Sequence, residues 1–287
     1  MTHPKLSLAP LQFATLDTDQ LEHVFSFMDQ TAVDRARRFY HQDDAWRFLI
    51  GRMLRIVMLG DIGRDRGLTV PNLEFSQTPA GKPYIVAPQS LSSVGFNVSH
   101  DGAVVLMGIL ETRGSSGASA IGVDIMKAEI PVNDDLLSFI ASIESTLTRS
   151  ESRHLRQLAA AESTRSQATK HLFQLWTLKE AYVKALGVGI TFELSRIHFD
   201  FETSVLAVDG EPLGRWGVIS FGLSSLFSGD VLEEYVGAVC YQLDSSDVET
   251  GGIVEWVSVA EDHRFTFVDQ HDLIQRVAPG SSVVNAS

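Results

Sequence analysis

The chain has 287 residues, with 23 Lys and Arg against 36 Asp and Glu, and a formal net charge of −13. This acidity does not fit a general nucleic-acid binder, because phosphate contacts need a broad basic surface. It also does not fit a polybasic protein at a membrane surface. Hydrophobic residues make up 44% and charged residues 21%, which is typical of a folded globular protein.

The first part of the chain is predicted to be helical. Apolar residues recur every three or four positions over 18–29 and 42–63, which is the spacing of an amphipathic helix, and a short helix is predicted at 31–40. Residues 71–92 contain four prolines and are predicted to be mostly loop. Short apolar runs then predict strands at 94–98, 103–110 and 120–125.

The second part mixes helices and strands. Helices are predicted at 133–144, 148–161, 165–186 and 268–277. Strands are predicted at 197–201, 216–222, 235–243 and 253–259, and the last ten residues are expected to fray. Each half therefore has helices and about three strands. We expect an α+β fold of two similar α/β lobes, 1–115 and 116–287, joined by a flexible surface loop near 111–120.

The cellular location is predicted from what the sequence lacks. The N-terminal residues do not have the basic-then-apolar layout of a signal peptide. No apolar run approaches the roughly 20 residues that span a bilayer. The single cysteine, Cys240, excludes an intramolecular disulfide, and its apolar neighbours indicate a buried, inert thiol. We expect a cytoplasmic protein without membrane contact.

The negative charge is unevenly distributed. Residues 1–192 carry 19 basic and 20 acidic side chains, whereas residues 193–287 carry 4 basic and 16 acidic ones. Within the first part, residues 35–66 hold eight arginines and four aspartates. Such a local excess can attract an anionic ligand even on an acidic protein. The alternative is a solvated helix face with Asp–Arg pairs.

The first candidate site is the segment Asn97-Val98-Ser99-His100-Asp101-Gly102, at the end of a predicted strand. His100 can donate to a phosphate oxygen, Ser99 can donate or accept, and Asp101 can reach a metal ion directly or through water. The alternative is a plain hairpin turn with Asp-Gly at its tip.

The second candidate is Asp124, which lies inside the apolar run Ile121-Gly122-Val123-Asp124-Ile125. Burying a carboxylate without a partner is costly. A magnesium ion is one suitable partner, because Mg²⁺ is usually held by one or two carboxylates together with substrate phosphates and water. A structural, hydrogen-bonded aspartate is the alternative.

The third candidate is the helix segment from Leu175 to Gly187. At 100° per residue, Trp176, Glu180 and Lys184 share one helix face, and Lys179 lies beside them. Glu180 could bind a cation or accept a proton, and Lys184 could neutralise a phosphate. The alternative is that Glu180 and Lys184 form an ordinary stabilising i,i+4 pair.

Together these motifs closely resemble the 4′-phosphopantetheinyl transferases of the long, surfactin-synthetase type, in a variant similar to the eukaryotic and fungal members. The resemblance runs from about Arg35 to Phe201. The matching motifs are Arg38-Phe39-Tyr40-His41 with Arg47, Gly81-Lys82-Pro83-Tyr84, Asn97-Val98-Ser99-His100, Gly122-Val123-Asp124, and Trp176-x-x-Lys179-Glu180-Ala181-x-x-Lys184-x-x-Gly187.

The resemblance implies a monomer built as a pseudo-dimer, with coenzyme A in a cleft between the two lobes. It implies that Asp124 and Glu180 bind Mg²⁺. The positions matched to coenzyme A binding are Arg35, Arg38, Arg47, Lys82, Pro83, Ser99, His100, Lys179 and Lys184.

The resemblance also implies the reaction. The serine hydroxyl of a carrier protein attacks the β-phosphorus of coenzyme A, and 3′,5′-ADP departs. Glu180, Lys184 and His100 are the implied catalytic residues, with Glu180 as general base and Lys184 stabilising the leaving phosphate. The carrier domains served by such enzymes belong to fatty acid synthases, polyketide synthases, nonribosomal peptide synthetases and aminoadipate reductase.

Two positions depart from the family pattern. Many bacterial members carry a second carboxylate two residues after the first, where this chain has Met126. We expect Asp101 or water to fill that metal position. Several members also carry lysines in a region where this chain has none, residues 28–34. Contact with the 3′-phosphate should therefore rest on Arg35, Arg38 or Arg47.

Two rival functions differ in class from this one. One is another Mg²⁺-dependent enzyme of coenzyme A or nucleotides, and the other is a coenzyme A-binding or carrier-docking module without catalysis. On the transferase interpretation, the acidic residues of 193–287 should lie away from the coenzyme A cleft.

Overall fold

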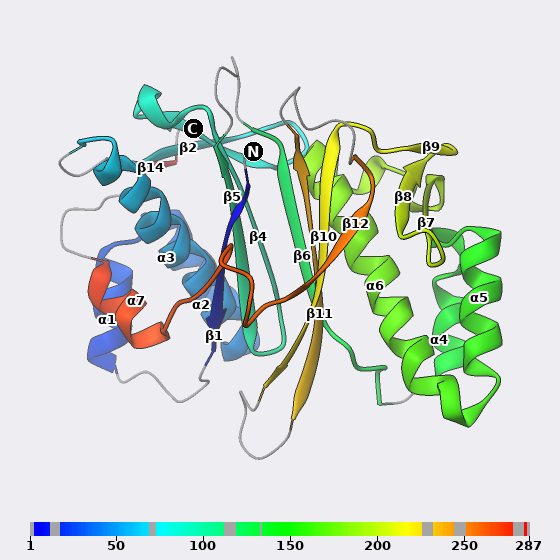
Figure 1. The fold of residues 1–287 in the computed structure, drawn as a ribbon. Coiled ribbons are helices and arrows are strands. Elements are labelled where there is room, and N and C mark those ends of the chain that lie inside the picture. Colours follow the sequence, from blue (N-terminus) through cyan, green and yellow to red (C-terminus); the bar gives the residue numbers. More distant parts are fainter. Residues whose placement is uncertain are drawn as a thin grey trace.

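The computed structural model describes residues 3–11, 18–68, 73–111, 119–132, 134–225, 232–243, 251–277 and 284–285. Two four-stranded sheets stand at the centre, and helices cover their outer sides (Figure 1). The expected mixed α+β class is confirmed. No helix in the described ranges has both the length and the apolar composition that a membrane crossing demands.

The first sheet has the strand order β13-β1-β5-β4. Its antiparallel part consists of β1 (Lys5–Pro10), β5 (Val104–Glu111) and β4 (Val94–Asp101). The helices beside it are α1 (Thr18–Ser26), α2 (Gln30–Arg38) and α3 (Gln42–Asp65). The apolar positions of α3 that recur at helical spacing are buried, including Leu49, Met53 and Val57, so the predicted amphipathic helix forms as its pattern indicates.

The second sheet has the strand order β12-β10-β11-β6. Its strands are β6 (Ile121–Lys127), β10 (Trp216–Ser225), β11 (Glu233–Gln242) and β12 (Val254–Ser258). Helix α6 (Glu162–Leu186) lies on this sheet, α5 (Arg149–Ala159) packs against α6, and α4 (Leu136–Ser142) packs against α5. A smaller sheet of β7 (Ile197–Asp200), β8 (Val205–Val208) and β9 (Glu211–Pro212) follows α6.

Side chains join the two sheets where main-chain pairing is missing. The edge strands β4 and β6 face each other, and Asn97 Oδ1 accepts a hydrogen bond from the Val123 N–H at 2.9 Å. Four residues further along each strand, Asp101 Oδ2 accepts from the Lys127 N–H at 2.7 Å. Since alternate strand residues share a face, Asn97 and Asp101 point to the same side of β4 and form a regular bridge between the sheets.

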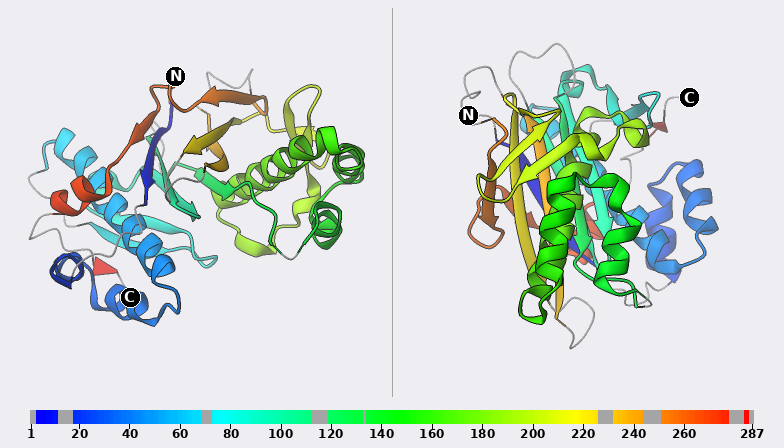
Figure 2. Two further views of the ribbon diagram at one scale, coloured as in Figure 1. Left: turned by 90° about the horizontal axis from the view of Figure 1, so that it is seen from below. Right: turned by 90° about the vertical axis from the view of Figure 1, so that its right-hand side faces the viewer.

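The C-terminal segment returns to the first sheet. Strand β13 (Phe265–Phe267) pairs in parallel with β1, and α7 (Gln270–Arg276) packs beside α3 (Figure 2). Trp46 Nε1 donates to Gln270 Oε1 at 3.1 Å, and the short strand β14 (Val284–Asn285) pairs in parallel with β2 (Glu74–Gln77). The expected division at 115/116 therefore differs from the packing, because these C-terminal elements lie with the N-terminal half.

Most predicted helices and strands form, with three differences. Within residues 71–92, which the sequence predicts to be mostly loop, β2 (Glu74–Gln77) and β3 (Pro83–Ala87) form a short antiparallel hairpin. Residues 99–101 are strand rather than turn. Strands β1, β8, β9 and β13 have no counterpart among the predictions. The predicted loop near 111–120 and the frayed last ten residues lie largely outside the described residues.

Candidate active site between β4, β6 and α6

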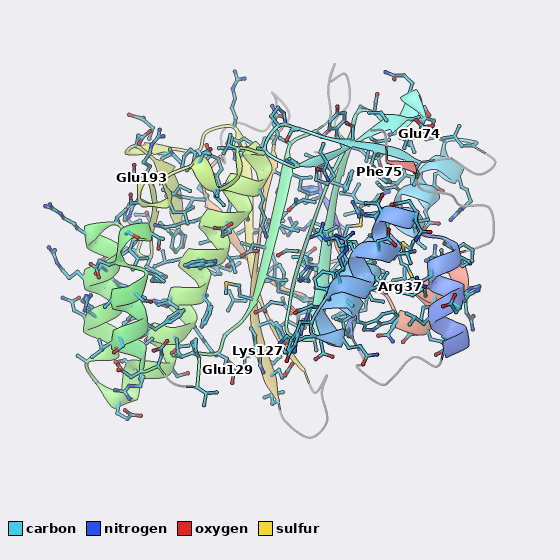
Figure 3. All side chains as sticks on the ribbon, turned by 180° about the vertical axis from the view of Figure 1, so that it is seen from behind. Arg37, Glu74, Phe75, Lys127, Glu129 and Glu193 are labelled. Carbon is cyan, nitrogen blue, oxygen red and sulfur yellow. The ribbon has the colours of Figure 1, made fainter. Side chains whose placement is uncertain are left out.

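The site forms where α6 lies directly on β6. Gly122 makes this approach possible, since a Cβ at this position would lie 2.1 Å from the Ala181 carbonyl oxygen and 2.2 Å from the Ala185 nitrogen. The helix backbone therefore rests on the strand two residues before Asp124. Figure 3 shows α3 and α6 on the same face of the molecule, on either side of the strands.

Asp124 is buried and only half satisfied. Its Oδ1 accepts from Lys184 Nζ at 2.6 Å and from Ser99 Oγ at 2.8 Å, and Lys184 Nζ also donates to Ser99 Oγ at 3.0 Å. Its Oδ2 is buried and has no hydrogen-bond partner among the described residues. Burial raises the pKa of this carboxyl above its usual value, an effect larger than the opposing charge and hydrogen bonds of Lys184 and Ser99.

Glu180 is half-buried beside Asp124 and forms no hydrogen bond or ion pair with any described residue. Burial raises the pKa of Glu180, and the neighbouring charge of Asp124 raises it further. The alternative of an ordinary i,i+4 pair fails here, because Lys184 binds Asp124 instead of Glu180. Two carboxylates with free oxygens therefore lie together in a partly desolvated place.

These carboxylates fit a hard cation. An unsatisfied buried carboxylate oxygen is rare in folded proteins and calls for an explanation such as an absent ion. Oxygen ligands of this kind suit Mg²⁺, which keeps water and substrate phosphates in its shell. Within the described residues there is no group of three or more His, Cys, Asp or Glu side chains placed to hold a metal. Asp124 and Glu180 would therefore be its two protein ligands.

Asp101 does not join the two carboxylates, although its charge contributes slightly to the raised pKa of Asp124. Its Oδ2 accepts the Lys127 N–H in the bridge between β4 and β6. Met126 stands where many bacterial members carry the second carboxylate. It is partly buried against apolar side chains of the second half of the chain. The metal role that was expected of Asp101 is thus not supported by its placement.

His100 and Arg47 lie next to this cluster. Arg47 on α3 donates to the Gly102 carbonyl oxygen at 2.6 Å and to Asp44 at 2.7 Å. His100 is solvent-exposed at the end of β4, on the opposite face of the strand from Ser99. Desolvation by the surrounding protein lowers the pKa of His100, and the charges of Arg47 and Lys184 lower it further.

A cavity of about 560 Å³ opens beside Glu180 and Lys184. This volume suits a small-molecule ligand. Its other lining residues are Ala80, Gly81, Lys82, Pro83, Asn97, Ser145, Thr146, Val183, Gly187, Gly189, Ile190, Phe192, Glu193 and Leu194. Lys82 and Pro83 thus line the same cavity as Glu180 and Lys184.

Lys82 connects the cavity to the end of α6. Its Nζ donates to the carbonyl oxygens of Ala185 at 2.7 Å and Ile121 at 3.0 Å, and burial lowers the pKa of Lys82 to about 8. Gly187 ends α6 with φ 68°, and a Cβ there would lie 2.7 Å from Lys82 Cδ. Glycine is therefore needed both for the left-handed helix end and for the approach of Lys82.

Lys179 points away from the cavity, which corrects its predicted phosphate contact. Its Nζ pairs with the buried carboxylate of Glu151 at 2.7 Å and donates to the carbonyl oxygens of Thr146 at 2.8 Å and Leu194 at 3.3 Å. Only 2% of the Lys179 side chain is exposed. A phosphate cannot reach an ammonium group enclosed in this way. Since Thr146 and Leu194 line the cavity, Lys179 instead fixes two of its walls.

Arg35 and Arg38 also lie apart from the cavity. Both are exposed on α2, where Arg38 Nε donates to the Asp34 carbonyl oxygen at 3.2 Å. The sequence did not single out the residues that follow Gly187, although a glycine helix end reverses the chain and places Ile190 and Phe192 beside the helix. Of the described carboxylates in 193–287, Glu193 alone lines the cavity, and Figure 3 labels it.

Comparison with known proteins now adds a family. Residues 120–240 match the 4′-phosphopantetheinyl transferase superfamily, and residues 16–110 match the family of N-terminal regions of 4′-phosphopantetheinyl transferases. The chain is 32% identical to the 4′-phosphopantetheinyl transferase pptA of Paxillus involutus over 216 residues, which cover 75% of this chain and 79% of that protein.

Two further relatives agree. A phosphopantetheinyl transferase of Thraustochytrium sp. is 30% identical over 237 residues, covering 81% of this chain and 76% of that protein. The 4′-phosphopantetheinyl transferase Sfp of Bacillus subtilis is 28% identical over 195 residues, covering 66% and 75%. Asp124, Glu180 and Lys184 all lie within the matched residues 120–240. The chain therefore belongs to the 4′-phosphopantetheinyl transferase superfamily and is an enzyme of the long type.

Proposed function

We propose that the enzyme moves the 4′-phosphopantetheine arm of coenzyme A onto a serine of a carrier-protein domain, with Mg²⁺ at Asp124 and Glu180. The observation that carries this proposal is the pair of carboxylates with free oxygens beside a cavity of ligand size. The two sheets, each with its long helix α3 or α6, are proposed to act as the two lobes of a pseudo-dimer. Coenzyme A would then bind between them, and the chain would act as a monomer in the cytoplasm.

Mg²⁺ held by Asp124 and Glu180 would supply positive charge to the pyrophosphate of coenzyme A. Lys184 is fixed by Asp124 Oδ1 and Ser99 Oγ, which leaves its third N–H free to donate to a phosphate oxygen. His100 would donate one further hydrogen bond to a phosphate oxygen. Lys82 adds a positive charge at the cavity wall.

The chemical step joins the serine oxygen to the β-phosphorus of coenzyme A. The bond from that phosphorus to the oxygen bridging to the α-phosphorus breaks, and its electron pair leaves with 3′,5′-ADP. The serine proton passes to Glu180, the carboxylate on the α6 face that lines the cavity. Lys184 stabilises the charge that develops on the departing phosphate.

The test is incubation of the enzyme with an apo carrier domain, coenzyme A and Mg²⁺, followed by the intact mass of the carrier. We expect the mass to rise by one phosphopantetheine group. A hydrolase would consume coenzyme A equally well without the carrier. A binding module would bind coenzyme A without consuming it. Tight coenzyme A binding with no mass gain on carriers from all four expected systems would contradict the proposal.

A further inference from the structure

The turn between β4 and β5 is held by a strand of the other sheet. The hydroxyl oxygen of Tyr235 on β11 accepts the Ala103 N–H at 2.7 Å, and the hydroxyl donates to Glu233 Oε2 at 2.6 Å. Tyr235 is only 1% exposed. A buried hydroxyl that donates to one group and accepts from another has a fixed orientation. Tyr235 therefore holds the turn in one position.

Lys127 on β6, which Figure 3 labels, supports this tyrosine. It lies opposite Tyr235 in the pairing of β6 with β11. Its Nζ pairs with Glu233 Oε1 at 3.0 Å, and its backbone N–H donates to Asp101 Oδ2 at 2.7 Å. Asp101 lies two residues before Ala103, so the same set of contacts binds the turn at two points.

Gly102 allows the tyrosine to approach the turn. Its φ is 49°, and a Cβ at this position would lie 2.3 Å from the Tyr235 hydroxyl oxygen. Glycine is therefore needed here both for the left-handed backbone and for the contact with the tyrosine. The sequence left a plain hairpin turn as the alternative for this segment, and a plain turn would need only the backbone conformation.

The peptide group that joins Gly102 to Ala103 is bound on both sides. Its carbonyl oxygen accepts from Arg47 Nε on α3 at 2.6 Å, and its N–H donates to Tyr235. A planar peptide group turns as one unit, so loss of the contact with Tyr235 would also loosen the carbonyl oxygen that Arg47 binds. The orientation of the Arg47 guanidinium group therefore depends on a tyrosine in the other sheet.

We propose that Tyr235 is a positioning residue for coenzyme A binding, which acts on Arg47 through the peptide group between residues 102 and 103. The inference rests on the proposed function, because it requires Arg47 to contact coenzyme A. Tyr235 does not line the cavity beside Glu180 and Lys184, so it acts through another residue. An arginine that is oriented before the ligand arrives loses less conformational entropy on binding.

The first experiment needs no coenzyme A. Nuclear magnetic resonance on the full chain with isotope-labelled arginine measures how fast the Arg47 Nε–H exchanges with solvent. Tyr235→Phe keeps the ring and removes the hydroxyl, and it should raise this exchange rate roughly threefold or more. Tyr241→Phe is the matched control, because it removes the hydroxyl of another buried tyrosine near the far end of β11 and should leave the rate unchanged.

A second variant covers the case in which Tyr235→Phe folds poorly. Glu233→Gln leaves the tyrosine and the turn intact, but it breaks the ion pair with Lys127 and weakens the contact that orients the hydroxyl. It should raise the Arg47 exchange rate in the same direction by a smaller factor. Wild-type exchange rates in both variants would overturn the inference.

The second experiment is a double-mutant cycle on coenzyme A binding. Calorimetry gives the dissociation constant for the wild type, Tyr235→Phe, Arg47→Gln and the double variant. Tyr235→Phe should raise the constant about three- to tenfold in the wild type and leave it unchanged in the Arg47→Gln background. A purely structural tyrosine would weaken binding by the same factor in both backgrounds.

These outcomes separate the inference from the proposed function. A wild type that binds no coenzyme A contradicts the proposed function and the inference with it, and this result is seen before any variant is compared. A wild type that binds coenzyme A, with the same loss from Tyr235→Phe in both backgrounds, contradicts the inference alone.

Discussion

Lys184 Nζ lies 2.6 Å from Asp124 Oδ1, so the lysine of α6 reaches across to β6 and not along its own helix to Glu180. In the part of the chain that the structure describes, this contact leaves Glu180 without a hydrogen-bond or ion-pair partner, and Asp124 Oδ2 has no hydrogen-bond partner. The two carboxylates suit a hard cation such as Mg²⁺. The charges of Asp124, Glu180 and Lys184 therefore influence one another.

The first prediction concerns the cation. Mg²⁺ should raise the melting temperature of the wild-type chain, because the ion binds the folded carboxylates and not the unfolded chain. Glu180→Gln removes one ligand and should abolish this rise. In the absence of Mg²⁺ the same variant should melt at or above the wild-type temperature, since it removes a desolvated carboxylate next to Asp124. Glu162→Gln, an exposed residue on the same helix, is the control. An equal response to Mg²⁺ in both variants would exclude Glu180 as a ligand.

The second prediction concerns the contact between α6 and β6. Gly122→Ala places a Cβ against the α6 backbone, which cannot move aside as a flexible side chain can. We expect a loss of about 2 kcal/mol or more in the free energy of unfolding, together with a loss of transfer activity. Gly214→Ala is the matched control, because its Cβ would meet nothing within 4 Å. Equal stability of the two variants in urea unfolding would contradict the described packing.

The third prediction concerns Lys179. Lys179→Met leaves the buried Glu151 carboxylate uncompensated, and we expect a loss of about 3–5 kcal/mol in urea unfolding. Lys170→Met breaks an exposed pair with Glu234 and should cost less than about 1 kcal/mol. If Lys179 instead contacted a phosphate in solution, Lys179→Met would weaken coenzyme A binding and leave the stability nearly unchanged.

The sequence indicates which residues of α6 share a helix face, but it does not indicate which face meets the cavity. The spacing of Trp176, Glu180 and Lys184 placed them on one face, and all three are partly exposed, whereas Lys179 is buried on another face. The family motif contains Lys179 as well as Glu180, so it does not show which of the two side chains faces the cavity. Helical periodicity gives the angles between side chains around the helix axis. Which helix face meets the cavity is decided by α5, where Glu151 binds Lys179 although it lies 28 residues away in the sequence.

Long-range packing explains the remaining differences. Within the proline-rich stretch 71–92, β2 and β3 form strands because they pair with each other in a separate small sheet. A proline lacks the backbone N–H, and at an edge of such a sheet this loss is tolerated. Strand β13 has only three residues, and it is strand because β1 offers an open edge. Asp101 has the chemistry of a metal ligand, yet the Lys127 N–H on the neighbouring strand engages it. Such partners cannot be inferred from local pattern.

The fourth prediction concerns Lys82 and pH. Its pKa of about 8 lies well below the usual value, so the side chain loses its charge as the pH rises through about 8. Coenzyme A binding should therefore weaken between about pH 7 and pH 9. Lys82→Met should bind weakly throughout this range and should lack that inflection, which calorimetry at several pH values can measure. The same inflection in Lys82→Met would assign the pH dependence to another group.

The fifth prediction concerns a histidine pair outside the site. His154 Nε2 and His171 Nδ1 lie 2.8 Å apart, both rings stack on Phe201, and desolvation lowers the pKa of His171 to about 4. The unfolded chain then binds a proton more readily than the folded chain between about pH 6.5 and pH 4, so the stability falls as the pH drops through this range. His171→Asn should flatten this part of the stability profile. An unchanged slope would contradict the lowered pKa.

The central claim is that Asp124, Glu180 and Lys184 form a transferase site and not a structural ion pair. The most direct measurement is the single-turnover rate of phosphopantetheine transfer to an apo carrier, followed by intact mass, for the wild type, Glu180→Gln and Glu162→Gln. We predict that Glu180→Gln reduces the rate at least about 100-fold while its folding is intact, and that Glu162→Gln keeps the wild-type rate. A Glu180→Gln enzyme that modifies the carrier at the wild-type rate would contradict the claim.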